Sequence, residues 1–209
     1  MLLWINGPFG GGKTQTAHEL HRRLPNSVIC DPEHIGFGLL RTLPRSLRRD
    51  FQDLVAWRQG VVEVLDLALR GHDGVVIAPM TVVRREYLDE TVGRLREHGH
   101  VVHHFALLAN RATVLRRLRE RNVGHALHVM TGRAGLRRKS FAVAHLDDCL
   151  ERLADPAFAE HIRTDDISIA QVADRIAASS GLTLAPNTDG ALRGRLRRAW
   201  VGAKHIRLD

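Results

Sequence analysis

The segment that most constrains this chain is GPFGGGKT at residues 7–14, because it lies between a short apolar run and a helical pattern. It matches G-x-x-x-x-G-K-[ST], the Walker A phosphate-binding loop, with an expected strand at Leu2–Asn6 and an expected helix at Lys13–Leu24. Glycines let successive backbone amides turn toward an anion, and the helix N-terminus adds partial positive charge. The dinucleotide pattern G-x-G-x-x-G fails, because Gln15 stands where its third glycine is needed. We therefore predict that the loop binds a nucleoside triphosphate.

The loop supplies the predicted nucleotide-binding residues. These are Gly7, Phe9, Gly10, Gly11, Gly12, Lys13, Thr14 and Gln15. Lys13 is expected to reach the terminal phosphates and to take part in catalysis, and the Thr14 hydroxyl is the candidate ligand for Mg²⁺. The predicted cofactors are therefore ATP and Mg²⁺, and Lys13→Ala should abolish nucleotide binding.

The sequence gives a weaker signal for the carboxylate that would activate the hydroxyl receiving the phosphoryl group. Many P-loop enzymes end a later strand with an aspartate that orders Mg²⁺, but the third expected strand ends VVIAPMT without one. Asp31 follows the second expected strand, Ser27–Cys30, and the carboxyl ends of parallel strands line the crevice where ligands bind. We therefore take Asp31 as the candidate catalytic residue, which accepts a proton from an acceptor hydroxyl or orders a metal-bound water. The alternative is that Asp31 only caps the turn that contains Pro32.

Basic residues gather in the expected helix Thr113–Arg121, which precedes a polar stretch at about 122–140. That stretch lacks periodicity and has the composition of a mobile lid. Successive arginines on a helix point in different directions, so one or two can reach phosphate oxygens while the others face solvent. The candidates for stabilising a transferring phosphoryl group are Arg117 and Arg121.

Short apolar strands alternate with helices along most of the chain, which predicts an α/β fold with a parallel sheet covered on both faces. Further strands are expected at 75–78, 101–108 and 161–164, and further helices at 51–69, 86–97 and 146–153. A last helix of this domain is expected to begin at a capping box of Ser168 and Gln171 and to end at Gly181. We expect residues 1–184 to form the nucleotide-binding domain. Residues 185–209 then form a C-terminal tail, with a basic helix at 191–203.

Net charge, cysteine and histidine spacing and the length of apolar runs limit the kinds of function that this chain can have. The net charge of +8 suits nucleotide phosphates, nucleic acid or an anionic membrane surface, but no nucleic-acid recognition motif accompanies it. Cys30 and Cys149 lack CxxC spacing and are expected to be buried thiols, and the histidines of HELH at 18–21 and His103 with His104 are expected to be structural. No apolar run reaches the length of a bilayer span and no signal-peptide pattern opens the chain, so we expect a cytoplasmic protein.

Several segments in order closely resemble the bacterial tunicamycin-resistance ATP-binding proteins. They are LLWINGPFGGGKTQTAHELHRRL, DPEHIGFGL, VVIAPMTVV, GRLREHGHVVHHFALLA, LRRLRER and HIRTDDISI, and they span nearly the whole chain. The stretch from Gly124 to Lys139 departs from the family pattern as an insertion. The resemblance implies a three-layer P-loop fold similar to nucleoside monophosphate kinases, with a five-stranded parallel sheet in the order 2-3-1-4-5.

The resemblance also implies a role in resistance to tunicamycin, a uridine-containing nucleoside antibiotic, with Asp31 in the place of the catalytic aspartate of antibiotic phosphotransferases. Two functions stay open: phosphorylation of tunicamycin or a related nucleoside with ATP, or ATP-dependent binding that sequesters the drug at the membrane. The family further implies membrane association through the C-terminal helix. Leu192, Leu196 and Trp200 do recur every four residues beside arginines, a pattern that suits either a membrane surface or packing on the core.

Overall fold

The computed structural model describes residues 1–126, 146–156 and 159–188, with the side chains of 121–126 left out. Most of the predicted lid, the insertion and the tail helix with Leu192, Leu196 and Trp200 lie outside the described residues. None of the helices in the described ranges is long and apolar enough to cross a membrane.

Five parallel strands form one sheet in the order β2-β3-β1-β4-β5, which confirms the predicted topology. The strands are β1 (Leu2–Asn6), β2 (Ser27–Ile29), β3 (Val75–Pro79), β4 (Val102–Leu108) and β5 (Glu160–Arg163). The central strand β1 pairs through Leu2 with Val76 on one side and Val102 on the other. The loop that follows β1 therefore begins in the middle of the carboxyl edge.

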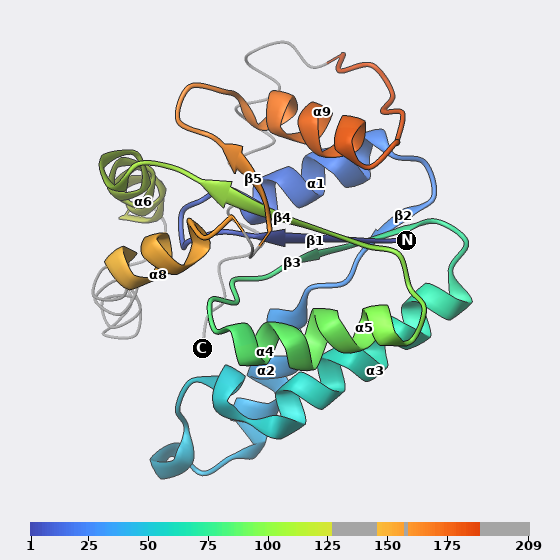
Figure 1. The fold of residues 1–209 in the computed structure, drawn as a ribbon. Helices are drawn as coiled ribbons and strands as arrows, with labels where there is room; N and C mark the ends of the chain where they lie inside the picture. Colours follow the sequence, from blue (N-terminus) through green and yellow to red (C-terminus); the bar gives the residue numbers. More distant parts are fainter. Residues whose placement is uncertain (127–145, 157–158, 189–209) are drawn as a thin grey trace.

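Helices cover both faces of the sheet, as predicted (Figure 1). One face carries α1 (Lys13–Arg23) and α9 (Ile169–Ser179), and the other carries α2 (Pro32–Thr42), α3 (Val55–Gly71), α4 (Arg85–Leu88) and α5 (Arg94–Glu97). Two more helices, α6 (Arg111–Ala126) and α8 (Leu146–Leu153), lie at the end toward which β1 and β4 point. The carboxyl edge of the sheet is thus bordered by helices.

Residues of β1 alternate between two hydrophobic clusters. Leu2 and Trp4 pack in the cluster with α3, whereas Leu3 and Ile5 pack in the cluster with α1 and α9, and all four are fully buried. Because successive side chains of a strand point to opposite faces, a strand covered on both faces is apolar throughout. This burial fixes the position at which β1 ends and the loop begins.

The structure adds one helix to the prediction and corrects two others. The helix α2 was not predicted, although Asp31 caps it and Pro32 occupies its first turn, a combination that favours a helix start. The predicted helix 51–69 begins instead with a separate 3₁₀ turn, Phe51–Asp53, and α3 starts at Val55. The predicted helix 86–97 exists, but a π-helical turn at Asp89–Gly93 joins α4 to α5.

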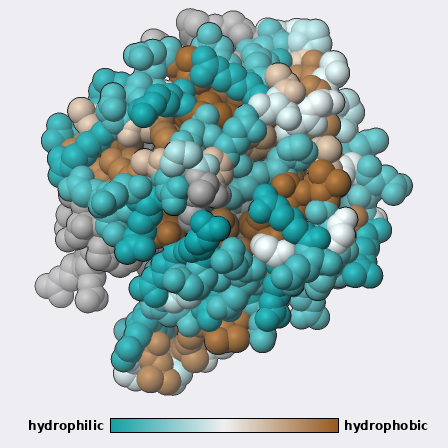
Figure 2. All heavy atoms as spheres, viewed as in Figure 1, coloured by the Kyte–Doolittle hydropathy of each residue, from teal (hydrophilic) through white to brown (hydrophobic). Residues whose placement is uncertain are grey.

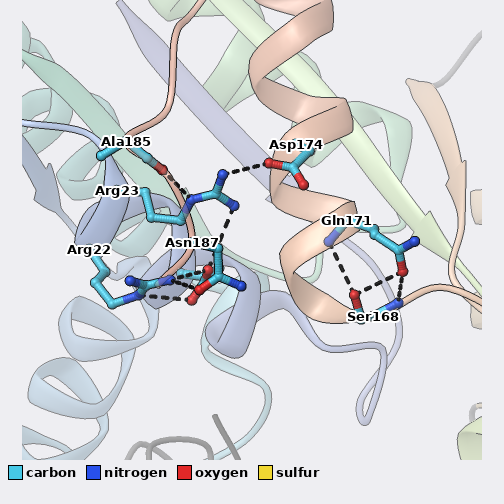
Figure 3. A network of polar contacts seen from close by, with 8 residues as sticks. Arg22, Arg23, Ser168, Gln171, Asp174, Ala185 and Asn187 are labelled. Atoms are coloured by element: carbon cyan, nitrogen blue, oxygen red, sulfur yellow. Dashed lines mark hydrogen bonds and ion pairs between the residues drawn. The ribbon is translucent and has the colours of Figure 1, made fainter. Parts of the chain in front are cut away.

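The capping box at the start of α9 is confirmed: the Ser168 side chain accepts from the Gln171 amide, and the Gln171 side chain accepts from the Ser168 amide (Figure 3). In the same view, Arg23 at the end of α1 binds the carbonyl of Ala185 and the carboxylate of Asp174, both at 2.8 Å. The predicted tail thus starts with residues that are bonded to α1.

The surface seen in Figure 2 is mostly hydrophilic, with scattered hydrophobic atoms. A hydrophobic group at its lower end lies over the connection between α2 and α3, where Leu47 is exposed. This connection includes a second 3₁₀ turn, Arg45–Leu47, and leads to the residues that border the candidate site.

Candidate active site

The glycine loop between β1 and α1 depends on left-handed backbone at two positions. Gly10 has φ 79° and Gly12, the N-cap of α1, has φ 96°, a region that L side chains rarely adopt. A Cβ atom at Gly10 would also lie 3.0 Å from Cγ of Leu118 in α6. The sequence therefore needs glycine here both for its backbone angles and for the close approach of α6.

Lys13 lies at the first turn of α1 and is only 8% exposed. Its Nζ donates hydrogen bonds to the carbonyls of Gly7 at 3.0 Å and Pro8 at 3.1 Å, and it lies 5.6 Å from the centre of the Phe9 ring. The ammonium group is therefore held over the loop that it was predicted to serve.

The other loop residues suit a phosphate ligand. Thr14 and Gln15 are half-buried in the first turn of α1, where backbone amides have no acceptor within the helix. This turn contains no acidic residue, so nothing in it opposes the partial positive charge of the helix N-terminus. Mg²⁺ in nucleotide sites takes few protein ligands besides phosphate oxygens, and the Thr14 hydroxyl fits that requirement.

Asn6, the last residue of β1, holds the loop in place through both ends of its side-chain amide. Its Oδ1 accepts from the amides of Gly7 at 2.8 Å and Val82 at 3.1 Å, and its Nδ2 donates to the Val82 carbonyl at 2.7 Å. Nδ2 also lies 3.2 Å from Nε2 of His104 on β4, a contact that fits the structural role predicted for that histidine. Sequence reasoning missed Asn6, because an asparagine at a strand end carries no special pattern.

Thr81 occupies the segment after β3, where the sequence lacks the expected aspartate. Its hydroxyl donates to the Gly7 carbonyl at 2.8 Å, and the residue is buried. Together with Asn6, it fastens the start of the glycine loop to the neighbouring strand. This position is therefore structural here, and sequence reasoning did not identify it.

Asp31 lies at the carboxyl edge, after β2, and is half-buried. Its Oδ1 accepts from the backbone amide of Glu33 at 2.9 Å, so it caps α2. This contact is the one that the alternative interpretation predicted, and a capping role does not by itself exclude a further role for the carboxylate.

The predicted arginines have different surroundings. Arg117 is half-buried and donates to the hydroxyl of Thr164 at 3.0 Å and to its carbonyl, beyond the end of β5. Burial lowers the pKa of this guanidinium. Arg116 and Arg119 are exposed on the same helix, while the Arg121 side chain lies outside the described part of the chain.

A cavity of about 340 Å³ lies beside the glycine loop. Its lining comes from the loop, the connection between α2 and α3, the segment after β3, and α8: Pro8, Phe9, Asp50, Gln52, Asp53, Thr81, Val83, Arg84, Leu146, Asp148 and Cys149. Asp31 does not belong to this lining within the described residues. Sequence reasoning missed Asp53 and Arg84, because only the fold brings these segments to one place.

The two cysteines differ in burial. Cys149 is buried as predicted, and burial raises the pKa of its thiol to about 11, so the thiol stays protonated at neutral pH. Cys30 is half-buried, and burial raises the pKa of its thiol as well. Neither thiol has the lowered pKa of a reactive nucleophile.

The profile of the AAA domain family matches residues 2–143. The tunicamycin resistance protein of Deinococcus radiodurans is similar in structure, with a TM-score of 0.70 and 34% sequence identity over 88% of this chain and 98% of that one. No curated protein matches the sequence.

More distant structures share the fold alone. A gluconokinase from Sinorhizobium meliloti has a TM-score of 0.56 at 14% identity, over 98% of this chain and 97% of that one. The Mycobacterium tuberculosis APS kinase in complex with AMPPNP and APS has a TM-score of 0.53 at 14% identity, over 86% and 96%. The fold is therefore kinase-like. The chain belongs to the AAA domain family and, within it, to the family of the tunicamycin resistance protein.

Proposed function

We propose that this protein is a phosphotransferase that confers tunicamycin resistance by moving a phosphoryl group from ATP to a hydroxyl of tunicamycin or a related nucleoside. The observation that carries the proposal is a phosphate loop, with its lysine in place, that forms one wall of a cavity of about 340 Å³ through Pro8 and Phe9. Donor and acceptor can then meet at the loop. The 34% identity with a tunicamycin resistance protein supports the choice of drug.

Each residue of the predicted site has a role in this reaction. ATP supplies the transferable phosphoryl group, with Mg²⁺ as its companion ion. Lys13 exchanges the carbonyls of Gly7 and Pro8 for phosphate oxygens, the loop amides bind the phosphates, and Thr14 offers its hydroxyl to Mg²⁺. Arg117 and Arg121 neutralise charge on the migrating group.

The chemical step needs a proton acceptor, and we assign that role to Asp31. The acceptor hydroxyl gives its proton to the Asp31 carboxylate, its oxygen forms the new bond to phosphorus, and the bond from phosphorus to the ADP oxygen breaks. The same carboxylate can continue to cap α2, because a carboxylate has two oxygens and accepts several hydrogen bonds.

The test is mass spectrometry of tunicamycin after incubation with ATP and Mg²⁺. The expected product is heavier by one phosphate group and forms with the wild-type protein but not with Lys13→Ala. Asp31→Asn should bind ATP normally and lose the product, whereas Asp73→Asn, an exposed aspartate before β3, should form it as the wild type does. Intact drug after incubation with the wild type refutes phosphorylation.

The second candidate is ATP-dependent binding of the drug without modification. The contact between Asp31 and the start of α2 favours it, because that contact gives the carboxylate a structural role that needs no chemical step. Resistance that survives Asp31→Asn but is lost with Lys13→Ala would select this function.

We also propose where in the cell the protein acts. We expect a cytoplasmic protein whose basic C-terminal segment, predicted from the sequence to be a helix, can meet an anionic membrane surface. Co-sedimentation with anionic vesicles, compared between the full chain and Trp200→Ala, tests this contact. Equal sedimentation of both proteins, or of neither, refutes a contact through the helix.

A further inference from the structure

The cavity beside the glycine loop has a lining of mixed chemistry. Val83 and Leu146 contribute apolar surface, and the carboxylates of Asp50, Asp53 and Asp148 outnumber the one cation of the described lining, Arg84. The loop forms one wall through Pro8 and Phe9, and the other lining residues come from elsewhere in the chain. These other residues can recognise a part of a ligand other than the nucleotide phosphates.

We propose that this cavity holds the part of the phosphoryl acceptor that lies away from its reacting hydroxyl, since Asp31 is not in the described lining. We further propose that Asp53 determines specificity there, by accepting a hydrogen bond from another hydroxyl of a neutral, hydroxyl-rich ligand such as the sugar part of a nucleoside antibiotic. The proposal rests on the proposed function for the identity of the acceptor. It adds a residue and a binding mode that the phosphate loop does not supply.

Among the described residues, the recorded contacts of Asp53 fall on one of its two oxygens. Its Oδ1 accepts from the Tyr87 hydroxyl at 2.7 Å and lies 3.5 Å from Nη1 of Arg84, and the side chain is 47% exposed. The contacts that the described residues make with this carboxylate all involve Oδ1. Oδ2 remains able to accept a hydrogen bond from a ligand hydroxyl. A neutral sugar carries several hydroxyl groups that can donate such a bond.

The residues behind Asp53 fix its orientation. Tyr87 accepts a hydrogen bond from Arg84 at 2.9 Å while it donates to Asp53, and the guanidinium carbon of Arg58 lies 4.4 Å from the centre of its ring. Arg58 is buried and bonded to Glu90 at 2.7 Å. Because this chain of contacts exists before any ligand arrives, binding does not have to order the carboxylate.

Charge favours the same class of ligand. A hydrogen bond to a carboxylate is stronger than one between neutral groups, and ligand hydroxyls can donate it. An anionic ligand would instead face the carboxylates of Asp50 and Asp53, and that of Asp148 with its ion-pair partner Arg152, while Arg84 is the only cation of the described lining. The cavity thus suits a neutral acceptor better than a phosphorylated or carboxylated one.

The experiment measures KM and kcat for tunicamycin with the full chain and its Asp53→Asn variant. Asparagine keeps the shape and can still accept from Tyr87, but it places an amide where a carboxylate oxygen stood. We expect KM for tunicamycin to rise about tenfold, the size of one lost hydrogen bond to a charged group, with kcat and KM for ATP within about threefold. Asp53→Glu should restore part of the KM, and Asp73→Asn is the matched control.

Asp148→Asn tests the part of the cavity that α8 lines. This residue is also exposed, so both variants should keep the melting temperature of the wild type, and Asp148→Asn should raise KM for tunicamycin in the same direction as Asp53→Asn. Unchanged KM in both variants, with wild-type phosphoryl transfer intact, overturns the assignment of the cavity and leaves the proposed function standing.

The two proposals fail in different ways. If the wild type transfers no phosphate, the same variants are compared by equilibrium dialysis with tunicamycin. A Kd weakened about tenfold by Asp53→Asn then supports the cavity while refuting phosphorylation, and an unchanged Kd refutes the cavity as well.

Discussion

Asn6→Ala should destabilise the protein and disable nucleotide binding together. Asn6 is fully buried, and its loss leaves the Gly7 amide, the Val82 amide and the Val82 carbonyl without their side-chain partner. A buried backbone group left unsatisfied costs about 1–3 kcal/mol, so three groups at the lower bound give about 3 kcal/mol. That is a large fraction of the roughly 5–15 kcal/mol that stabilises a typical domain.

Urea unfolding followed by tryptophan fluorescence measures this loss, because Trp4 and Trp57 are fully buried in the native state. With a slope of about 2 kcal/mol per M, a loss of about 3 kcal/mol lowers the urea midpoint by about 1.5 M. ATP affinity, measured by calorimetry below the transition, should fall in the same variant because the glycine loop loses its anchor.

The matched control is Asn187→Ala, which removes an exposed hydrogen bond to Arg22 and, as a surface substitution, should change stability by less than about 0.5 kcal/mol. Thr81→Ala removes a single buried bond to the Gly7 carbonyl and should fall between the two, near about 1 kcal/mol. If Asn6→Ala costs no more than Asn187→Ala, the loop does not depend on this side chain and the reasoning fails.

Three further outcomes are expected. Lys13→Ala should abolish ATP binding in calorimetry while the urea midpoint stays within about 1 M, and wild-type affinity in this variant would contradict the assigned loop. Asp66→Asn should lower the stability of the protein at neutral pH but not near pH 2. Hydrogen bonds from His100, Arg70 and His98 lower the pKa of Asp66 from 3.8 to about 2, so the stabilisation by its carboxylate is present above about pH 4 and is lost as the pH falls through 2. If the difference in melting temperature between the two proteins stays the same from pH 7 to pH 2, this reasoning is wrong. Gly36→Ala places a Cβ 2.5 Å from the Phe51 ring, so the melting temperature should fall and tunicamycin should bind more weakly as residues 51–53 shift. An unchanged melting temperature would mean that the ring can move aside without cost.

Much of the fold followed from local patterns. Apolar runs at 2–5 and 75–78 predicted strands buried on both faces, and GPFGGGKT predicted the strand-loop-helix unit because left-handed backbone at Gly10 and Gly12 requires glycine. The strand order came from the family resemblance, since pairing between distant strands leaves no local signal. The helix α2 was missed because Asp31 and Pro32 were interpreted as a strand end, although the same pair favours a helix start.

Some residues of the candidate site could also be predicted from the sequence, and others could not. The sequence by itself determined the phosphate loop and Lys13, because a run of adjacent residues makes that site and its geometry follows from local backbone angles. Only the tertiary structure decided that Asn6 and Thr81 fasten the loop, and that Asp53 and Arg84 line a cavity with Phe9. These contacts join residues from strands and connections far apart in the chain, and their positions depend on how the helices pack over the sheet, which no spacing along the sequence records.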